Sequence, residues 1–342
     1  MIKAVIIHKE KGYYGAMTQL KDERAALVPS IRSRHVLPAV FQFTRGAEKP
    51  VAEFFVAHLR NRNTRKAYAQ AVTDFGTWCA HQGISSLTQV QPVHVSSYVE
   101  ELTSKIAPPS VKQKLTALRM LFDWLVVHQV LPSNPAHAVR GPKCVVKKGK
   151  TSVLSAEETR ELLDHIDTNT IVGLRDRALI ALLVYSFARI GAATAMRGGD
   201  VYIQGKRTWV RLHEKGGKRH EMPAHHNLEA YLDAYITAAG LAKDPKGPLF
   251  RSTMGRSGKL TDRPLHQPDV YRMIARRAAA ADIRTRIGCH TFRATGITEY
   301  LRNGGKLEVA QAMANHESAR TTGLYDRRQD EVSLDEIERI LI

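Results

Sequence analysis

Residues suited to phosphoryl transfer are concentrated in the second half of the chain. Two histidines, an arginine and a tyrosine fall within 36 positions, and a further arginine and a lysine precede them. The six residues are Arg189, Lys215, His290, Arg293, His316 and Tyr325. The i, i+3 spacing of His290 and Arg293 places both side chains on one face of a helix. This combination of residue types predicts a site that cleaves phosphodiesters.

Phosphodiester cleavage without a metal ion requires a nucleophile, cations and a proton donor. The cations stabilise charge that develops on the non-bridging oxygens, and the proton goes to the leaving 5′ oxygen. A planar arginine guanidinium can contact two phosphate oxygens and stays charged. A tyrosine can attack phosphorus to give a link that a hydroxyl later reverses. Histidine can accept the phenolic proton near neutral pH, and a lysine with a depressed pKa can donate a proton.

Each of these residues has a simpler structural explanation when it is considered alone. His290 could cap a helix, Arg189 could cap the C-terminus of the apolar helix before it, and Tyr325 could be a packed aromatic. Lys215 could be an ordinary turn lysine, and Arg293 a surface cation. The order and spacing of the six residues, with the local structure predicted around them, favour one common site.

The composition indicates a basic protein of about two domains. The chain has 342 residues, of which 43% are hydrophobic, and a formal net charge of +18. Such a charge suggests a polyanionic partner, first nucleic acid and second an anionic membrane, although a basic protein without such a partner is the alternative. No apolar run approaches the roughly 20 residues that span a bilayer, and the N-terminus lacks the features of a signal peptide. We therefore expect a soluble, cytoplasmic protein without a membrane partner.

The three cysteines do not suggest a metal site or a disulfide framework. Cys79, Cys144 and Cys289 are far apart, and none belongs to a Cys-x-x-Cys pair. Cys289 precedes His290, but a buried filler is a commoner role for a free cysteine than a nucleophile. We expect no cofactor and no metal.

The N-terminal half predicts an extension followed by a helical bundle. Residues 1–48 are expected to form an N-terminal extension of uncertain order, either a loosely ordered segment or a DNA-contacting arm. Residues 49–139 carry apolar side chains at helical spacing and predict a compact bundle of four or five helices, the first over 51–59. The aromatics Tyr68, Trp78 and Trp124 share this spacing, so we expect them in the core rather than stacked on bases.

Basic side chains on the bundle and the following linker are candidates for DNA contact. The segment 140–152 is rich in Lys and Arg and contains Gly and Pro, which predicts a linker that could follow a phosphate backbone. For any single basic residue of the bundle, an ordinary solvated surface is the alternative. The candidates are Arg62, Arg65, Lys66, Lys112, Lys114, Lys147 and Lys148.

Residues 153–342 predict a second, mainly α-helical domain with a small antiparallel β-sheet. A capping signal opens a helix at Ser155, and 175–185 is strongly apolar. The strand-like segments 209–213 and 219–223 flank a Gly-rich turn that carries Lys215 and Lys218. Further helices are expected over 225–239, 267–281, 290–302, 306–314 and 318–325, followed by an amphipathic segment at 333–341. The fold class is therefore α+β.

The six candidate residues and the sequence around them resemble the tyrosine recombinases, also called the phage-integrase family, and in particular its Xer-like members. The resemblance covers residues from about 50 to 342. The matching text is Phe187-Ala188-Arg189-Ile190, Glu214-Lys215-Gly216-Gly217-Lys218-Arg219, His290-Thr291-Phe292-Arg293, Ala314-Asn315-His316 and Thr321-Thr322-Gly323-Leu324-Tyr325. It implies an N-terminal SAM-like, core-binding domain that clamps DNA and a C-terminal catalytic domain.

The sequence departs from the usual family pattern in three places. The family often has Thr-Gly-Leu before the first arginine, where this chain has Ser186-Phe187-Ala188. It often has an acidic residue three positions after that arginine, where this chain has Ala192. The usual Leu-Gly-His is Ala314-Asn315-His316 here.

The resemblance implies a role for each candidate. Arg189 and Arg293 would bind the scissile phosphate, and His316 would hydrogen-bond to it. Tyr325 would attack to give a 3′-phosphotyrosyl intermediate. The two remaining roles are assistance of proton transfer, by His290, and protonation of the departing 5′ oxygen, by Lys215, with Lys218 as a close rival.

The resemblance also implies an assembly and a biological class. Four protomers would act on two double-stranded DNA sites and exchange the C-terminal helix, here 333–341, although this helix could instead fold onto its own domain. The chain would be an integrase or resolvase of a mobile element or replicon. Two alternatives remain: a type IB topoisomerase-like enzyme that nicks and closes strands, and a non-catalytic DNA-binding protein on the same fold.

Overall fold

The computed structural model describes residues 38–144, 149, 151–214, 217–255 and 257–326. The chain divides into two compact units, Met1–Val145 and Val146–Ile342, and the boundary lies within the segment that we predicted to be a linker. Several predictions lie outside the described residues. These are the extension up to residue 37, the linker lysines Lys147 and Lys148, the catalytic candidate Lys215, and the exchange helix 333–341.

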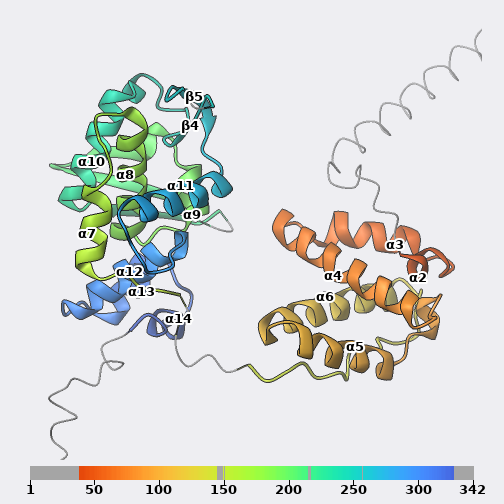
Figure 1. Cartoon of the computed structure of the whole chain (residues 1–342). Helices are drawn as coiled ribbons and strands as arrows, with labels where there is room; N and C mark the ends of the chain where they lie inside the picture. Colours follow the sequence, from red (N-terminus) through yellow and green to blue (C-terminus); the bar gives the residue numbers. More distant parts are fainter. Residues whose placement is uncertain (1–37, 145–148, 150, 215–216, 256, 327–342) are drawn as a thin grey trace, which may run out of the picture. The chain divides into compact units, whose positions relative to one another are not determined.

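The first unit is entirely helical in its described part (Figure 1). Its elements are α2 (Ala39–Gln42), α3 (Glu48–Glu53), the π-helix η1 (Phe54–His58), α4 (Arg62–His81), the 3-10 helix η2 (Leu87–Gln89), α5 (Pro92–Lys105) and α6 (Pro108–Val127). The two long helices begin after favourable caps: Asn61 accepts backbone hydrogen bonds at the start of α4, and prolines occupy the first turn of α6. This bundle confirms the predicted helical N-terminal domain.

The core of this unit starts earlier than residue 49. Val40 and Phe41 in α2 are fully buried, and Gly76 of α4 allows the chain at Pro38 to lie directly against that helix. A Cβ atom at Gly76 would lie 2.5 Å from Cβ of Pro38. The residues from 38 onward therefore belong to the folded unit, although the sequence suggested an extension as far as residue 48.

Two further details of the unit refine the sequence prediction. The expected helix at 51–59 is divided into α3 and η1, and Trp124 donates its indole N–H to the carbonyl of Pro50, 2.8 Å away. The π-helix leaves the neighbouring rings of Phe54 and Phe55 both buried, in an edge-on contact. Tyr68, Trp78 and Trp124 pack against the core, as their spacing predicted.

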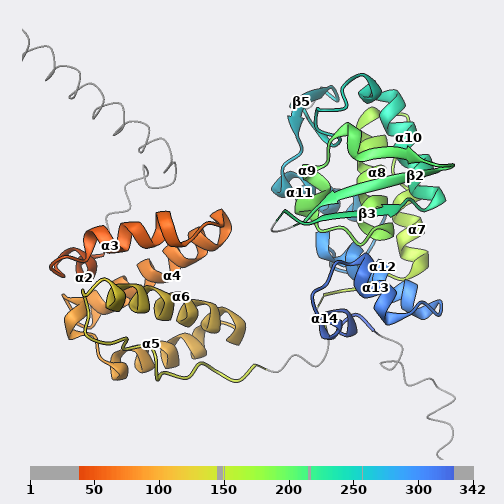
Figure 2. The same ribbon diagram turned by 180° about the vertical axis from the view of Figure 1, so that it is seen from behind.

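The second unit packs helices around α8, with a small sheet on one side of this helix (Figures 1 and 2). Its helices are α7 (Ala156–Asp164), α8 (Ile171–Tyr185), α9 (Ile190–Ala195), the 3-10 helices η3 (Gly198–Asp200) and η5 (Leu241–Lys243), α10 (His226–Ala238), α11 (Gln267–Ala280), α12 (Cys289–Arg302), α13 (Leu307–Met313) and α14 (Ala319–Gly323). Helix α8 is buried on nearly all sides, because its apolar residues surround the helix rather than forming one stripe.

Five short strands in the described ranges complete this unit. They are β1 (Val201–Gln204), β2 (Arg207–His213), β3 (Arg219–Pro223), β4 (Arg251–Thr253) and β5 (Leu260–Pro264). The order β1-β2-β3 is antiparallel throughout, and β4 pairs with β5. The β2–β3 hairpin and the mainly helical α+β class confirm the sequence prediction. The sequence did not reveal β1, β4 or β5, because these strands are short and partly polar.

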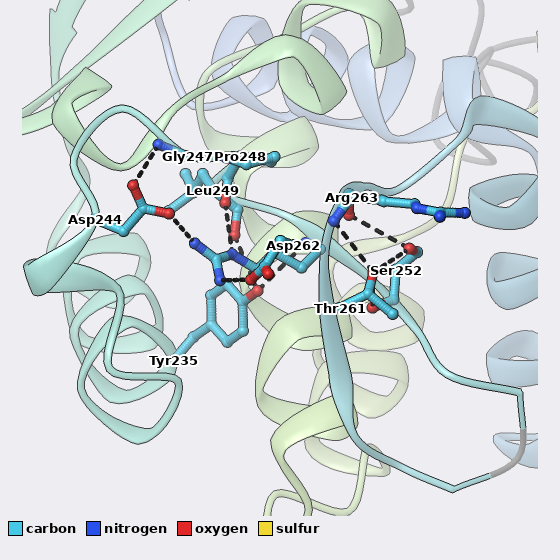
Figure 3. A network of polar contacts seen from close by, with 10 residues as sticks. Tyr235, Asp244, Gly247, Pro248, Leu249, Ser252, Thr261, Asp262 and Arg263 are labelled. Atoms are coloured by element: carbon cyan, nitrogen blue, oxygen red, sulfur yellow. Dashed lines mark hydrogen bonds and ion pairs between the residues drawn. The ribbon is translucent and has the colours of Figure 1, made fainter.

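A charge network around the buried carboxylate of Asp176 joins three elements of this unit. The carboxylate of Asp176 in α8 accepts hydrogen bonds from Arg175 and from Arg277 of α11, and Arg175 also donates to the carbonyl of Arg251 at 2.8 Å. Arg251 in turn binds Asp244 and Asp262 (Figure 3). The Arg175–Asp176 pair is buried, whereas Asp244 and Asp262 are exposed, and together these contacts link α11 and the β4–β5 hairpin to α8.

The crossing of α12 over the end of α8 is unusually close. A Cβ atom at Gly296 would lie 2.1 Å from the carbonyl oxygen of Val184 and 2.8 Å from the ring of Phe187. Only glycine allows this approach, which places the first turns of α12 beside the segment that follows α8. None of the described helices is long and apolar enough to cross a bilayer.

Candidate active site

Arg189 lies in the turn between α8 and α9. Phe187, two positions earlier, adopts a left-handed conformation with φ of 53°, and Arg189 is the N-cap of α9. The Nη1 atom of Arg189 donates to Oε2 of Glu214 at a distance of 2.7 Å. The guanidinium side chain is 37% exposed, whereas that of Glu214 is 4% exposed. A buried carboxylate therefore holds Arg189 in place, while the exposed part of its guanidinium is available to a ligand.

Arg293 lies in the second turn of α12 and is almost completely buried, at 2% exposure. Its Nη1 atom donates to the carbonyl of Phe187, and its Nη2 atom donates to the carbonyl of Ala314. Burial and the nearby positive charge of Arg189 lower the pKa of Arg293 to about 10. At neutral pH it stays charged, as a cation placed where an anion would be strongly attracted.

His316 follows α13 and is fixed at both its backbone and its ring. Its N–H donates to Gln311, its carbonyl accepts from the amide of Gln311, and its Nδ1 atom lies 2.9 Å from Oγ1 of Thr322. Burial, Arg293 and Arg189 lower the pKa of His316 to about 4. The imidazole is therefore neutral at physiological pH in the free protein, and it lies within electrostatic reach of the same two arginines.

His290 occupies the first turn of α12, at the exposed edge of the same region. Partial desolvation, followed by repulsion from Arg293 and Arg189, lowers the pKa of His290. A neutral histidine of this kind can accept a proton near neutral pH.

Tyr325 lies in the turn after α14, beside His316. The two rings are nearly parallel, with an interplanar angle of 10° and centroids 5.9 Å apart. The hydroxyl of Thr298 in α12 donates to the carbonyl of Tyr325 at 2.9 Å, and the tyrosine packs against a small cluster that includes Phe187 and Ile297. These contacts tie the turn that carries Tyr325 to the helix that carries Arg293.

The turn of the β2–β3 hairpin carries the two lysine candidates, Lys215 and Lys218. Lys215 lies outside the described residues, but the base of its turn is closed by a hydrogen bond from the N–H of Glu214 to the carbonyl of Lys218, at 2.8 Å. The Nζ atom of Lys218 donates to Glu317 at 3.0 Å, next to His316 in the chain. Lys218 is thus engaged in an exposed ion pair at the edge of the site.

The basic candidates of the first unit differ in what their side chains do. Arg62, Lys66 and Lys112 are exposed. Arg65 donates twice to the carbonyl of Leu59, so its guanidinium closes the start of α4. Lys114 pairs with Asp74 between α6 and α4. Within the described ranges, no group of three or more His, Cys, Asp or Glu side chains could hold a metal ion.

Family models match both halves of the chain. The phage integrase family matches residues 152–331, and the N-terminal SAM-like domain of phage integrases matches residues 52–129. The chain belongs to the phage integrase family. The match to the larger model includes all the positions that the sequence singled out for chemistry, from Arg189 to Tyr325.

Relatives of this integrase-family protein are named tyrosine recombinases. Tyrosine recombinase XerC of Myxococcus xanthus is 28% identical over 287 residues, which are 81% of this chain and 92% of that protein. A tyrosine recombinase of Pseudothermotoga lettingae is 26% identical over 292 residues, which are 84% of this chain and 96% of that protein.

Solved structures share the fold of this integrase-family chain at low sequence identity. The XerH recombinase in a post-cleavage complex with difH has a TM-score of 0.64 and 19% identity, covering 81% of this chain and 79% of that one. A lambda integrase dimer bound to a COC′ core site has a TM-score of 0.63 and 16% identity, covering 92% and 89%. The family matches and the named relatives confirm the resemblance stated from the sequence. The chain is a tyrosine recombinase, and neither the topoisomerase nor the non-catalytic alternative is favoured.

Two departures from the family pattern have a geometric explanation. Asn315 and Phe187 stand where the family often has glycine, and both adopt left-handed φ values, 46° and 53°. Glycine reaches this region freely, and asparagine is the residue that tolerates it next best. Phe187 is more strained, but its ring is buried against α12, beside Gly296 and Tyr300.

Sequence reasoning missed the residues that hold the candidates in place. Thr298, Thr322 and Glu214 contact Tyr325, His316 and Arg189 through hydrogen bonds that span between 6 and 27 positions of the chain. No local periodicity predicts such pairs. For Glu214, a sequence signal existed: it directly precedes Lys215 within a segment that matches the family.

Proposed function

We propose that this recombinase cleaves and rejoins double-stranded DNA at specific sites, with Tyr325 as the nucleophile. The phenolic oxygen attacks the scissile phosphorus, and the bond from phosphorus to the 5′ oxygen breaks. The DNA 3′ end is then held as a phosphotyrosyl ester. The free 5′ hydroxyl of a second strand attacks this ester, which restores the phosphodiester and releases Tyr325. The number of phosphoester bonds is conserved, so the reaction needs no external energy source.

The remaining residues stabilise and transfer charge in this scheme. Arg189 and Arg293 bind the non-bridging oxygens and offset the charge that develops on them. His316 hydrogen-bonds to the same phosphate. His290 accepts the phenolic proton of Tyr325, a role that its lowered pKa suits because the ring is neutral near pH 7.

The leaving 5′ oxygen receives a proton from the β2–β3 turn. Lys215 has this role in our proposal, because it stands in the matched text next to Glu214, which contacts Arg189. Lys218 remains the rival. Its ion pair with Glu317 would have to open before its ammonium could serve as an acid.

The observation that carries the proposal is that both arginines and both histidines lie close enough to affect one another electrostatically, with Tyr325 beside His316. Both arginines lower the pKa of both His290 and His316, so all four side chains lie within electrostatic reach of one another. Tyr325 stacks on His316. Segments that are 136 positions apart in the sequence, from Arg189 to Tyr325, thus supply the nucleophile and the phosphate-binding cations of one site.

The DNA partner and the assembly are further parts of the proposal. XerH is described in complex with its difH substrate, and lambda integrase as a tetramer bound to a Holliday junction. By this likeness, the basic chain binds a recombination site and works as a homotetramer on two sites. We place it in the cytoplasm, where it acts as an integrase or resolvase of a mobile element or replicon.

The test is covalent capture on nicked suicide DNA from the genomic neighbourhood of the coding sequence, with wild type and Tyr325→Phe compared. We expect wild type to form a denaturant-resistant adduct that peptide mapping places on Tyr325 with a 3′-phosphate. Tyr325→Phe should bind the DNA and form none. An adduct in Tyr325→Phe would refute the nucleophile, and a bound wild-type protein without any adduct would refute strand cleavage at this site.

Substitution of the lysines separates their roles in the same assay. A DNA substrate whose 5′ bridging oxygen is replaced by sulfur has a leaving group that does not need a proton. We expect this substrate to restore cleavage to Lys215→Ala. Restoration of Lys218→Ala instead would transfer the general-acid role to Lys218.

A further inference from the structure

We propose that Glu214 is a positioning residue of this active site, which holds the guanidinium of Arg189 in the geometry that receives the scissile phosphate. The inference rests on the proposed function, since it assigns a partner to one of the proposed phosphate ligands. It concerns a residue to which neither the sequence motifs nor the family match gives a role.

The geometry of Glu214 is that of an anchored carboxylate. It lies directly after β2, its side chain is 4% exposed, and Oε2 accepts from Nη1 of Arg189 at 2.7 Å. The backbone N–H of Glu214 donates to the carbonyl of Lys218, so the residue is fixed at the base of the hairpin. A buried carboxylate needs a cationic partner, and here that partner is Arg189.

The chain lacks an acidic residue where its family usually has one. Ala192 occupies the position three residues after Arg189, in α9, and its methyl group is 4% exposed within the core. A methyl group cannot accept a hydrogen bond from the guanidinium. Glu214 reaches Arg189 from another element, 25 positions later in the chain, and supplies the carboxylate that the helix does not.

Glu214 also offsets repulsion between the two arginines. The positive charge of Arg189 lowers the pKa of Arg293, and Glu214 opposes this effect. Without this carboxylate, the repulsion between the two guanidinium groups would be stronger. A neighbouring carboxylate keeps Arg189 in place until an anion arrives, so less reorganisation is needed when the phosphate binds.

The position of Glu214 links Arg189 to the proposed general acid. It directly precedes Lys215, and its two anchors, the Arg189 guanidinium and the Lys218 carbonyl, fix the point at which the β2–β3 turn leaves the sheet. Release of the carboxylate would therefore disturb a phosphate ligand and the base of the lysine turn together. We expect the loss to appear in the rate of cleavage rather than in the affinity for DNA.

The experiment compares Glu214→Gln with Glu214→Met in single-turnover cleavage of suicide DNA at saturating protein. Glutamine keeps an oxygen that can accept from Arg189, whereas methionine has a similar volume without this acceptor. Glu221→Met is the matched control, because Glu221 lies on the same hairpin and pairs with another arginine, Arg211, at 2.6 Å. DNA affinity and melting temperature are measured for each protein.

We expect Glu214→Met to cleave about 10² times more slowly, a loss typical of a catalytic group displaced by about 1 Å. Glu214→Gln should stay within roughly fivefold of wild type, DNA affinity should change less than about threefold, and Glu221→Met should cleave normally. Equal rates for Gln and Met would show that the acceptor oxygen at position 214 does not set the cleavage rate, and would overturn the proposal. If wild type binds DNA but forms no adduct, the proposed function fails, and this inference fails with it. A normal wild type with unimpaired Glu214→Met refutes the inference alone.

Discussion

Arg293 donates a hydrogen bond from its buried guanidinium to the backbone carbonyl of Phe187. The opposite edge of the same guanidinium donates to the carbonyl of Ala314. Each of these carbonyls lies two positions before another proposed catalytic residue, Arg189 in one segment and His316 in the other. One side chain of α12 therefore sets the relative position of both segments, in addition to its proposed contact with phosphate.

The close crossing at Gly296 should be required for this arrangement. In Gly296→Ala the new Cβ would meet the carbonyl of Val184 at 2.1 Å, so α12 must move away from α8. We expect a loss of about 1–3 kcal/mol in the free energy of unfolding, typical of overpacking, and a lower cleavage rate because Arg293 moves with the helix. Gly323→Ala, where nothing lies within 4 Å of the added Cβ, should be as stable as wild type or slightly more stable in thermal unfolding. A normal melting temperature for Gly296→Ala would contradict the crossing geometry.

The two left-handed residues should respond differently to glycine. At Phe187 glycine relieves backbone strain of roughly 1–2 kcal/mol but removes a fully packed ring worth about 3–5 kcal/mol. Phe187→Gly should therefore be less stable by about 2 kcal/mol. Asn315→Gly should change stability by only a few tenths of a kcal/mol, since asparagine tolerates this conformation and its side chain is less buried. Chemical denaturation of both variants measures the contrast, and a stabilised Phe187→Gly would show that strain outweighs packing.

The hydroxyl of Thr298 should matter to the nucleophile through its hydrogen bond to the carbonyl of Tyr325. Thr298→Val removes the donor at nearly constant volume, so we expect a loss of about 1 kcal/mol in stability and cleavage slower by roughly 10- to 100-fold. Thr295→Val is the control, because its buried hydroxyl lies in the same helix but accepts from the N–H of Leu154. Both variants should lose similar stability, and only Thr298→Val should slow adduct formation. Equal cleavage rates in the two would refute a positioning role for Thr298.

DNA binding should be linked to protonation of His316. In the free protein its pKa is lowered from 6.5 to about 4, and a bound phosphate favours the imidazolium and so raises the pKa. Between the pKa of the free protein and the higher pKa of the complex, binding takes up a proton, so affinity should increase as the pH falls towards about 4. Calorimetry in buffers with different ionisation enthalpies measures this uptake. His316→Gln should lose part of it, and an unchanged uptake in this variant would assign the proton to another group.

The lowered pKa of His316 also predicts that the stability of the protein depends on pH. A folded-state pKa below the unfolded value means that protonation of His316 favours unfolding. Its contribution is therefore present above about pH 6.5 and is lost as the pH falls to about 4. His316→Gln should lose less stability than wild type over this interval, as measured by melting temperature at pH 7 and pH 4.5. A steeper loss in the variant would contradict the depressed pKa.

The sequence by itself determined the class of the protein and most of its helices. Residue types at characteristic spacing, such as His290 with Arg293, and apolar residues at helical period, are local properties, so they predicted the fold class, the β2–β3 hairpin and the family. Only the tertiary structure decided which residues support the site. Glu214, Thr298 and the carbonyl of Phe187 act across long separations in the chain, and their contacts depend on how α12 crosses α8. Such contacts have no local signature, because they exist only after packing has brought distant segments within hydrogen-bond distance.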